Sequence, residues 1–225
     1  MDRAELNGDV SSLAGSLGRV TSAAIEQVGV DGMAVSVIAR KGTPVILHTT
    51  DPVSEELDEL QFTLGEGPGV DASTTGMPVL IADLEDRSGG VKNRWPVFRA
   101  EARRLGVRAY FAFPIRIGAI ALGTVGLQRR ESGDLDDHQL ARALTMVDAL
   151  AATLLDLGPA AHDEGVPTYP VVVHQAAGMV MAQLGCSIDE AMIRLRGTAF
   201  AEATRVSTLA ADIVAHRRRM EMEES

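Results

Sequence analysis

Residues 171–219 decide the fold of the C-terminal quarter of this 225-residue chain, and they read VVVHQAAGMVMAQLGCSIDEAMIRLRGTAFAEATRVSTLAADIVAHRRR. Apolar residues recur at intervals of three and four positions in three successive segments, which is the spacing of amphipathic helices. Pro170 and Gly185 predict the ends of the first helix, since proline suits a first turn and glycine suits a helix end. Ser187-Ile-Asp-Glu190 is a capping box that begins the second helix. The pattern predicts a small three-helix domain.

The same spacing predicts which side chains of this domain are buried. The interior positions are Val173, Ala177, Val180, Met181 and Leu184 in the first helix, Ile188, Ala191, Met192, Leu195 and Ala199 in the second, and Leu209, Ala210, Ile213 and Val214 in the third, which begins at Val206 or Ser207. Gly178 falls inside the first helix, where glycine costs up to about 1 kcal/mol relative to alanine. Another helix or RNA is therefore expected to approach Gly178 closely, and close helix packing is the simpler explanation.

This pattern resembles the ANTAR domain, a three-helix module of bacterial transcription antiterminators that bind hairpins in nascent RNA. The resemblance implies a transcription regulator rather than an enzyme, and a module that recognises tandem RNA hairpins as a dimer. The positions that carry it are Ala177, Gly178, Met181, Gly185, Ala191, Leu195, Arg196, Ala199, Leu209, Ala210 and Val214.

The distribution of charge agrees with a nucleic-acid surface in this segment alone. Between Tyr169 and Met220 there are six arginines and four acidic residues, a balance of +2, whereas the whole chain carries −10. RNA binding needs cations for phosphates and planar groups for splayed bases. An alternative for each arginine is that it solvates a helix face or pairs with a neighbouring acid; Arg217–Arg219 in particular are expected to be a solvated tail that closes the third helix. The candidate RNA-binding residues are Arg196, Arg194, His174, Gln175, Gly178 and Arg205.

The N-terminal two thirds alternate between helical and strand-like segments, which predicts a mixed antiparallel sheet with helices on one side. The expected helices are 11–28, 53–62 (a polar helix or loop), 91–105 and 135–157, and the expected hairpins join 34–39 to 45–49 across Lys41-Gly42 and 108–115 to 120–128 across Gly118, with a short apolar run at 78–81. Prolines and glycines in 158–169 mark a linker. The predicted organisation is α+β: a domain of mixed sheet and helices at 1–157, the linker at 158–169, and the all-α domain at 170–225.

The N-terminal region resembles a GAF domain of the type that precedes ANTAR modules in actinobacterial regulators. The segments that carry the resemblance are LGEGPGVDA (64–72), MPVLIADL (77–84), RWPVF (94–98), GVRAYFAFPIR (106–116) and ALGTVGLQRR (121–130). Related sequences often read EGPC where this one reads EGPG, so Gly69 replaces a cysteine and thiol-based sensing through this loop is not expected.

The resemblance also implies that residues 1–157 are a sensor and dimerisation domain, with a small-ligand site between the sheet and the middle loops. The candidate residues are Phe62, Gly65, Glu66, Gly67, Val70, Asp71, Trp95, Phe98 and Phe111. The alternative is that the glycines form turns and the aromatic rings fill the core.

The sequence lacks the residues that several other functions need. The Gly-Glu-Gly-Pro-Gly segment at 65–69 has no Lys-Ser/Thr for phosphates, and no GxGxxG or GxSxG motif is present. The five histidines and the single cysteine, Cys186, are not spaced as metal ligands, so no metal or other cofactor is expected. The acidic N-terminus and the absence of a long apolar run predict a cytoplasmic protein without a membrane segment.

These observations predict an RNA-binding antitermination regulator, in which a signal reorients a dimer through the apolar stripe at 140, 144, 147, 150 or 151 and 154. The stripe could equally pack on its own sheet. Two alternatives remain open: a helix-turn-helix DNA binder, and a GAF-based ligand sensor or dimeric scaffold that acts through a protein partner.

Overall fold

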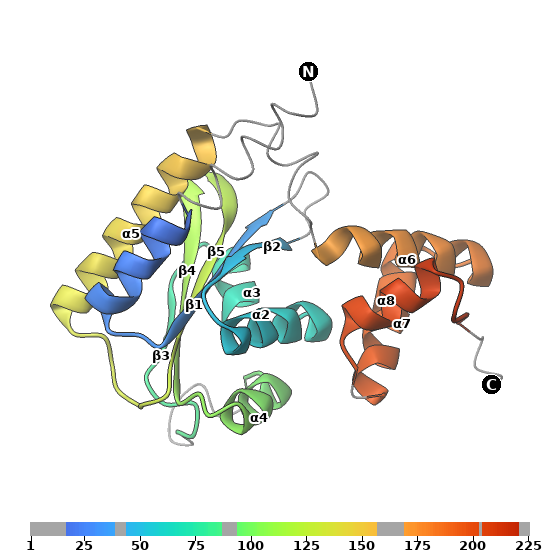
Figure 1. The fold of residues 1–225 in the computed structure, drawn as a ribbon, viewed down its shortest axis with the longest axis horizontal. Helices are drawn as coiled ribbons and strands as arrows, with labels where there is room; N and C mark the ends of the chain where they lie inside the picture. Colours follow the sequence, from blue (N-terminus) through green and yellow to red (C-terminus); the bar gives the residue numbers. More distant parts are fainter. Residues whose placement is uncertain (1–16, 39–43, 87–93, 157–168, 203, 221–225) are drawn as a thin grey trace. The chain divides into compact units, whose positions relative to one another are not determined.

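The computed structural model describes residues 17–38, 44–86, 94–156, 169–202 and 204–220, which form two compact units, Met1–Pro167 and Thr168–Ser225 (Figure 1). Each unit is described by itself. The predicted linker lies outside the described residues except for Tyr169, which begins the first helix of the second unit.

The first unit is built on a five-stranded sheet in which every neighbouring pair of strands is antiparallel. The strands are β1 (Gly32–Ile38), β2 (Pro44–Thr49), β3 (Val79–Ile81), β4 (Ala109–Ile117) and β5 (Ile120–Arg129), in the order β2-β1-β5-β4-β3. Both predicted hairpins are confirmed, as β1–β2 and β4–β5. The Lys41-Gly42 turn lies outside the described residues, whereas Gly118 takes a positive φ of 57° between β4 and β5, a conformation that favours glycine.

Five helices of this unit are described. They are an N-terminal helix over residues 17–28, which ends at Gly29, and α2 (Pro52–Leu64), α3 (Pro68–Thr75), α4 (Pro96–Arg104) and α5 (Asp137–Asp156). The sequence did not predict α3, because Gly-Pro-Gly reads as a turn; here Pro68 occupies the first turn of the helix, where its missing N–H costs nothing.

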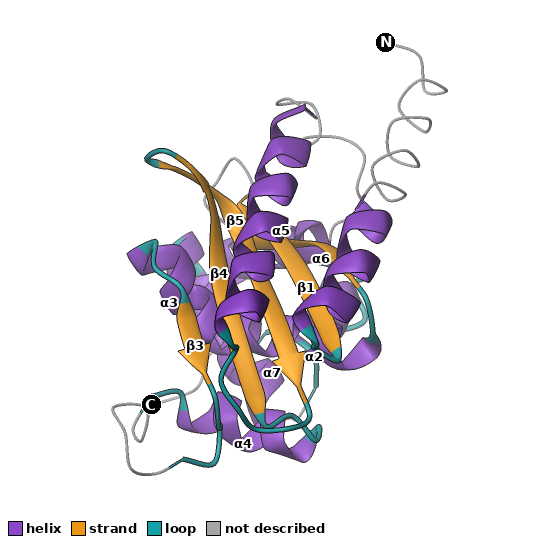
Figure 2. Ribbon diagram, turned by 90° about the vertical axis from the view of Figure 1, so that its left-hand side faces the viewer, coloured by secondary structure: helices purple, strands orange, loops and turns teal. Residues whose placement is uncertain are grey.

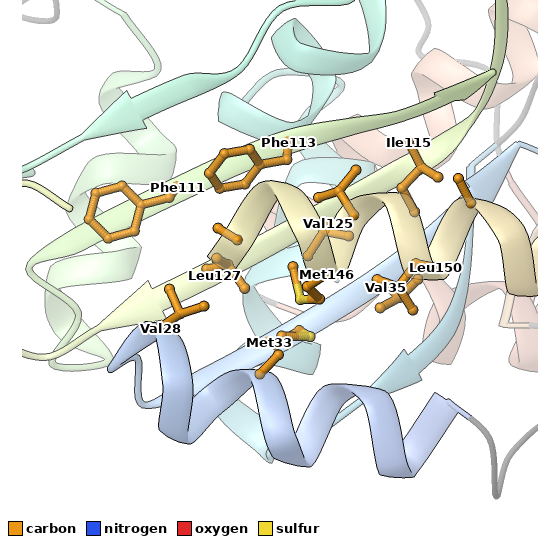
Figure 3. Close-up of a cluster of buried hydrophobic side chains, with 14 of the residues drawn as sticks. Val28, Met33, Val35, Phe111, Phe113, Ile115, Val125, Leu127, Met146 and Leu150 are labelled. Atoms are coloured by element: carbon orange, nitrogen blue, oxygen red, sulfur yellow. The ribbon is translucent and has the colours of Figure 1, made fainter. Parts of the chain in front are cut away.

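The helices cover both faces of the sheet, so the prediction of helices on one side was wrong. In Figure 1 the helix over 17–28 and α5 lie on one face and α2 and α4 on the other, and Figure 2 shows the first face in front. The reason is that successive side chains of a strand point to opposite faces of the sheet, and buried apolar side chains lie on both faces. Met33, Val35 and Val37 belong to the core under α5 (Figure 3), whereas Tyr110 and Ala112 belong to the core with Phe98 of α4.

The apolar stripe of α5 packs on its own sheet. Val147, Leu150 and Leu154 are buried in the core that the β4 and β5 side chains form, whereas Leu144 is 44% exposed. The second of the two explanations given for the stripe is therefore the one the structure supports, and most of this stripe is not available to a second copy of the chain.

The second unit consists of three helices, α6 (Tyr169–Leu184), α7 (Ile188–Ala201) and α8 (Val206–Val214), each in contact with the other two. Most predicted interior residues are buried, but Met181 and Ile188 are 39% and 43% exposed, so those two predictions were wrong. Ala176 and Val206 are buried in addition. Across the described residues, no helix combines the length and the apolar character needed to cross a membrane.

Candidate functional sites

The start of α7 is fixed by its capping residue. The Ser187 side chain accepts a hydrogen bond from the backbone N–H of Glu190 at 3.2 Å, which satisfies one of the free donors of the first turn. The Glu190 carboxylate lies 3.9 Å from the Arg194 guanidinium one turn later. The capping serine is thus confirmed, and it positions the helix that carries two of the candidate arginines.

The six candidate RNA-binding residues lie on all three helices. His174, Gln175 and Gly178 are on α6, Arg194 and Arg196 are on α7, and Arg205 is the N-cap of α8. Gln175 and Arg205 are exposed, and the other four are half-buried. Because residues two positions apart on a helix do not face each other, Arg194 and Arg196 point to different sides of α7.

Arg196 differs from the other arginines of this unit in its burial. Its Nε atom is buried, as is Nε2 of His174 on α6. Burial lowers the pKa of the Arg196 guanidinium below its ordinary value, because removal from water disfavours the charged form. A partly desolvated guanidinium is suited to stacking or to bidentate contacts with phosphate.

Two of the three C-terminal arginines, Arg217 and Arg218, form ion pairs with acidic residues of the same unit. The helix α8 ends at Val214, so they do not close it as predicted. Arg217 donates two hydrogen bonds to Asp212, at 2.9 and 2.6 Å, and Arg218 forms a bidentate pair with Glu202 at the end of α7. The carboxylate of Glu202 accepts these bonds, which lowers its pKa. These contacts fold the chain after α8 back onto the unit.

Gly178 has no close neighbour, so close packing within the unit does not explain it. A methyl group built on Gly178 would meet no atom within 4 Å, and the same holds for Gly197 on α7. The sequence predicted that another helix approaches Gly178 closely, and no described residue makes such an approach. Both glycines lie inside helices and lower helix stability without relieving a clash in their own unit.

In the first unit, a layer of polar side chains lies between α2 and the sheet. The Ser36 hydroxyl on β1 donates to Asp58 of α2 at 2.5 Å, Gln61 of α2 donates through Nε2 to the Tyr110 hydroxyl at 3.0 Å, and its Oε1 accepts from the N–H of Gly69 at 2.7 Å. On this face of the sheet the strands present small or polar residues, including Gly126, where the Tyr110 hydroxyl fills the space of a side chain. The layer links α2, α3, β1 and β4.

The polar layer perturbs the ionisation of two of its members. Desolvation raises the pKa of Asp58 to about 6, and the Ser36 hydrogen bond opposes this rise. Burial, and then the nearby Asp58 charge, raise the pKa of the Tyr110 hydroxyl, which therefore stays protonated. The sequence analysis missed this layer, although Ser54, Asp58 and Gln61 recur at positions that share one helix face, which was the available signal.

The nine candidate ligand residues do not converge on one site. Phe111 lies in the core on the α5 side of the sheet, whereas Phe98 and Trp95 lie in the core on the opposite face, because alternation along β4 separates the two sides. Phe62, Trp95 and Phe98 are buried. The structure thus uses these aromatic rings as core residues.

The glycine loop and Asp71 also have structural partners. Gly65 caps the end of α2 with φ 67°, and Gly67 precedes α3 with φ 146°, while Glu66 and Val70 are half-buried. Asp71 forms an ion pair with Arg94, whose guanidinium stacks 4.1 Å from the centre of the Trp95 ring. A side chain on Gly69, in the first turn of α3, would come within 3.1 Å of Oε1 of Gln61, so Gln61 would have to shift slightly to admit one.

Comparison with known proteins gives a family match for each of the two units. A family model of the GAF domain matches residues 11–155, and one of the ANTAR domain matches residues 170–214. The chain belongs to the GAF family and carries a C-terminal ANTAR domain. Both are regulatory domain families, and the predicted combination is confirmed, whereas the actinobacterial type stays a prediction. No curated protein matches the sequence.

Solved GAF domains share the fold of this GAF–ANTAR protein. The GAF domain region of a Geobacter sulfurreducens PCA protein aligns with a TM-score of 0.55 and 13% identity, over 68% of this chain and 99% of that one. A GAF domain from Synechocystis sp. PCC6803, in its photoproduct state, aligns with a TM-score of 0.50 and 14% identity, over 68% and 99%. At such identities the likeness shows the fold alone.

Proposed function

We propose that this chain is a transcription antitermination regulator of the actinobacterial type, in which the ANTAR half, residues 170–225, binds hairpins in nascent mRNA. The observation that carries the proposal is the ANTAR match over residues 170–214, which coincides with the three-helix unit α6–α8. The charge distribution supports it, since the segment from Tyr169 to Met220 carries a balance of +2 within a chain of net charge −10. Acidic surfaces elsewhere repel phosphates.

In this proposal Arg196 is the central RNA contact. Its burial reduces the freedom that the side chain loses on binding, so less of the contact energy is offset by ordering. Arg205 and Gln175 are exposed and serve as supporting contacts, with Arg194, His174 and Gly178. Because Arg194, Arg217 and Arg218 already lie near carboxylates, RNA has to compete for them, and we expect a modest salt dependence of binding.

The GAF half, residues 1–157, is the proposed sensor, joined to the ANTAR half by a linker at 158–169. The small-ligand site predicted between the sheet and the middle loops remains a prediction within this proposal. The protein is proposed to act as a homodimer in the cytoplasm, where nascent transcripts are made. Since the α5 stripe packs on its own sheet, the dimer requires another surface.

A gel-shift experiment with three probes tests the proposal. The chain is expected to bind a tandem-hairpin RNA more tightly than duplex DNA or a scrambled RNA. The Arg196→Ala variant is expected to lose ~5- to 100-fold in affinity, the range for one stacked or bidentate arginine. Arg130→Ala, which removes an exposed arginine from the GAF unit, is the matched control and should bind like the unmodified chain.

Two of the other outcomes would assign a different function, and a third would change only the central contact. A preference for duplex DNA would replace the proposal by a DNA-binding regulator. If neither nucleic acid binds, a GAF-based ligand sensor or a scaffold acting on a protein partner takes its place. Normal binding by Arg196→Ala would refute the assignment of the central contact and leave the RNA-binding function standing.

A further inference from the structure

The chain after α8 turns back onto its own unit through a defined set of hydrogen bonds. His216 takes φ 56°, a left-handed conformation that is uncommon for residues other than glycine. The N–H of His216 donates to the Ile213 carbonyl at 3.0 Å, and the N–H of Arg217 donates to the Asp212 carbonyl at 2.8 Å. These are the two hydrogen bonds of a Schellman motif. They fix the direction of residues 215–220, which we call the C-terminal strap.

Further contacts tie the C-terminal strap to the ends of α7 and α6. Arg218 forms its bidentate pair with Glu202, which is the C-terminal cap of α7. Two residues later, the N–H of Met220 donates to Oε1 of Gln183, in the last turn of α6, at 3.4 Å. With the turn after α8, the strap therefore contacts all three helices of the ANTAR unit.

Arg219 lies between two anchored residues and has no partner of its own. It is exposed, and its guanidinium forms no hydrogen bond or ion pair within the part of the chain that the structure describes, whereas Arg217 and Arg218 neutralise Asp212 and Glu202. The C-terminal strap thus presents one uncompensated positive charge at a fixed place. Because its neighbours are already held, Arg219 loses less backbone freedom on binding than an arginine in a free tail would lose.

We propose that the C-terminal strap is a phosphate-binding site for RNA, in which Arg219 contacts the phosphate. The site lies outside the ANTAR match, which ends at residue 214. Glu202, to which the strap is tied, follows Arg196 by six residues, or ~9 Å along the axis of α7, so both contacts can lie on one RNA hairpin. This inference rests on the proposed RNA binding of the ANTAR half.

The chemistry of the strap favours a phosphate over a base or a protein surface. His216, Arg217 and Arg219 are exposed, and the one large apolar side chain of the strap, Met220, is half-buried, so the strap lacks the apolar centre of a protein interface. An isolated cation pairs well with a nucleic-acid backbone, which presents a row of negative charges. Phosphate contacts carry no sequence information. Arg219 is therefore expected to strengthen the binding of any RNA and not to select tandem hairpins.

A salt titration of RNA binding by the full-length chain tests the site. Arg219→Ala is expected to lower the affinity ~2- to 5-fold, the range for one exposed ion pair, and equally for tandem-hairpin and scrambled RNA. It should also reduce the slope of log affinity against log salt by ~0.7–0.9, the value for one phosphate contact. Arg219→Lys keeps the charge and should keep the slope. Arg130→Ala, in the GAF unit, is the matched control and should change neither quantity.

Two features of the design separate an RNA contact from a structural effect. Arg219 makes no side-chain contact with a described residue, so Arg219→Ala should leave thermal melting of the chain unchanged. Residues 221–225, which include three glutamates, are kept in every variant, so their charge is the same on both sides of each comparison. A variant that melts earlier and binds more weakly would show a structural role and overturn the phosphate assignment.

A double-mutant cycle tests the anchoring. Arg218→Ala frees the strap from α7, and in that background Arg219→Ala should change the salt slope by less than half as much as in the unmodified chain. An equal change in both backgrounds would show a charge that acts without the strap, which would overturn the site. An unchanged slope for Arg219→Ala, in a chain that binds RNA, would also overturn it and leave the proposed function standing. If the unmodified chain binds no RNA, both proposals fail.

Discussion

Replacement of Asp58 by asparagine should stabilise the GAF unit near neutral pH and have little effect in acid. The carboxyl group belongs to the polar layer under α2, and burial raises its pKa from 3.8 to about 6. For an acid with a raised pKa, the folded state binds the proton more tightly than the unfolded state. The native state is therefore penalised as pH rises from about 4 to about 6, and it carries the full penalty above that range.

The size of the effect follows from the shift in pKa. At 1.36 kcal/mol per unit, the difference corresponds to ~3 kcal/mol. The Asp58 side chain keeps partial exposure, and asparagine is a weaker acceptor for the Ser36 hydroxyl, so we expect a gain of ~1–2 kcal/mol in the free energy of unfolding at neutral pH. At about pH 4 the carboxyl is protonated in the folded state and close to half protonated in the unfolded state, so most of the penalty is gone, and the gain should fall to a few tenths of a kcal/mol.

Urea unfolding followed by tryptophan fluorescence measures this directly. Trp95 is the only tryptophan of the chain and is buried in the GAF unit, so its emission reports that unit in the full-length protein. Asp134→Asn, at an exposed position before α5, is the control for a generic change in net charge. A gain that is equal at both pH values, or a loss at neutral pH, would refute the argument that desolvation of Asp58 dominates.

Three other substitutions give independent checks. Gly123→Ala should destabilise the GAF unit by ~3 kcal/mol or more, because the new methyl group would overlap the Ser36 carbonyl oxygen and lie 2.9 Å from the Val37 backbone; a soluble variant with an unchanged urea midpoint would contradict this. Gly178→Ala should raise the thermal stability of the ANTAR unit by ~0.5–1 kcal/mol, since its surroundings are open, and a loss would show a contact that the unit forms there. Ser187→Ala should cost ~1 kcal/mol through the lost cap of α7, which circular dichroism on melting would detect, with Thr208→Ala as the control.

The sequence predicted those elements whose signals are local. Ser187, the positive-φ glycines and the 3.6-residue spacing of Val173, Ala177 and Val180 act within one or two turns, and the structure confirms them. The predictions failed where long-range packing decides. The residues Met181 and Ile188 are apolar at helical spacing but fall outside the buried sector, because which side of a helix is covered depends on the directions of the other two.

The candidate sites also depend on long-range packing, which local sequence signals do not predict. Phe111 and Phe98 are both aromatic and buried, yet they lie on opposite faces of the sheet. A single sequence does not show which of the two faces would bind a ligand. The polar layer was missed because Ser36, Asp58 and Tyr110 are far apart in the chain and meet only through the β1 and β4 register. Along β1 and β5, successive side chains alternate between an apolar α5 side and a small or polar α2 side, a pattern that the sequence analysis did not use.

Transcription past a terminator tests the central claim most directly. A single-round reaction would use purified polymerase and a template that places a tandem hairpin before the terminator, with and without the full-length chain. The proposal predicts that the chain raises the fraction of full-length transcript, that Arg196→Ala abolishes the increase, and that a template with scrambled hairpins shows none. An unchanged fraction, under conditions where the chain binds the hairpin RNA, would contradict an antitermination function.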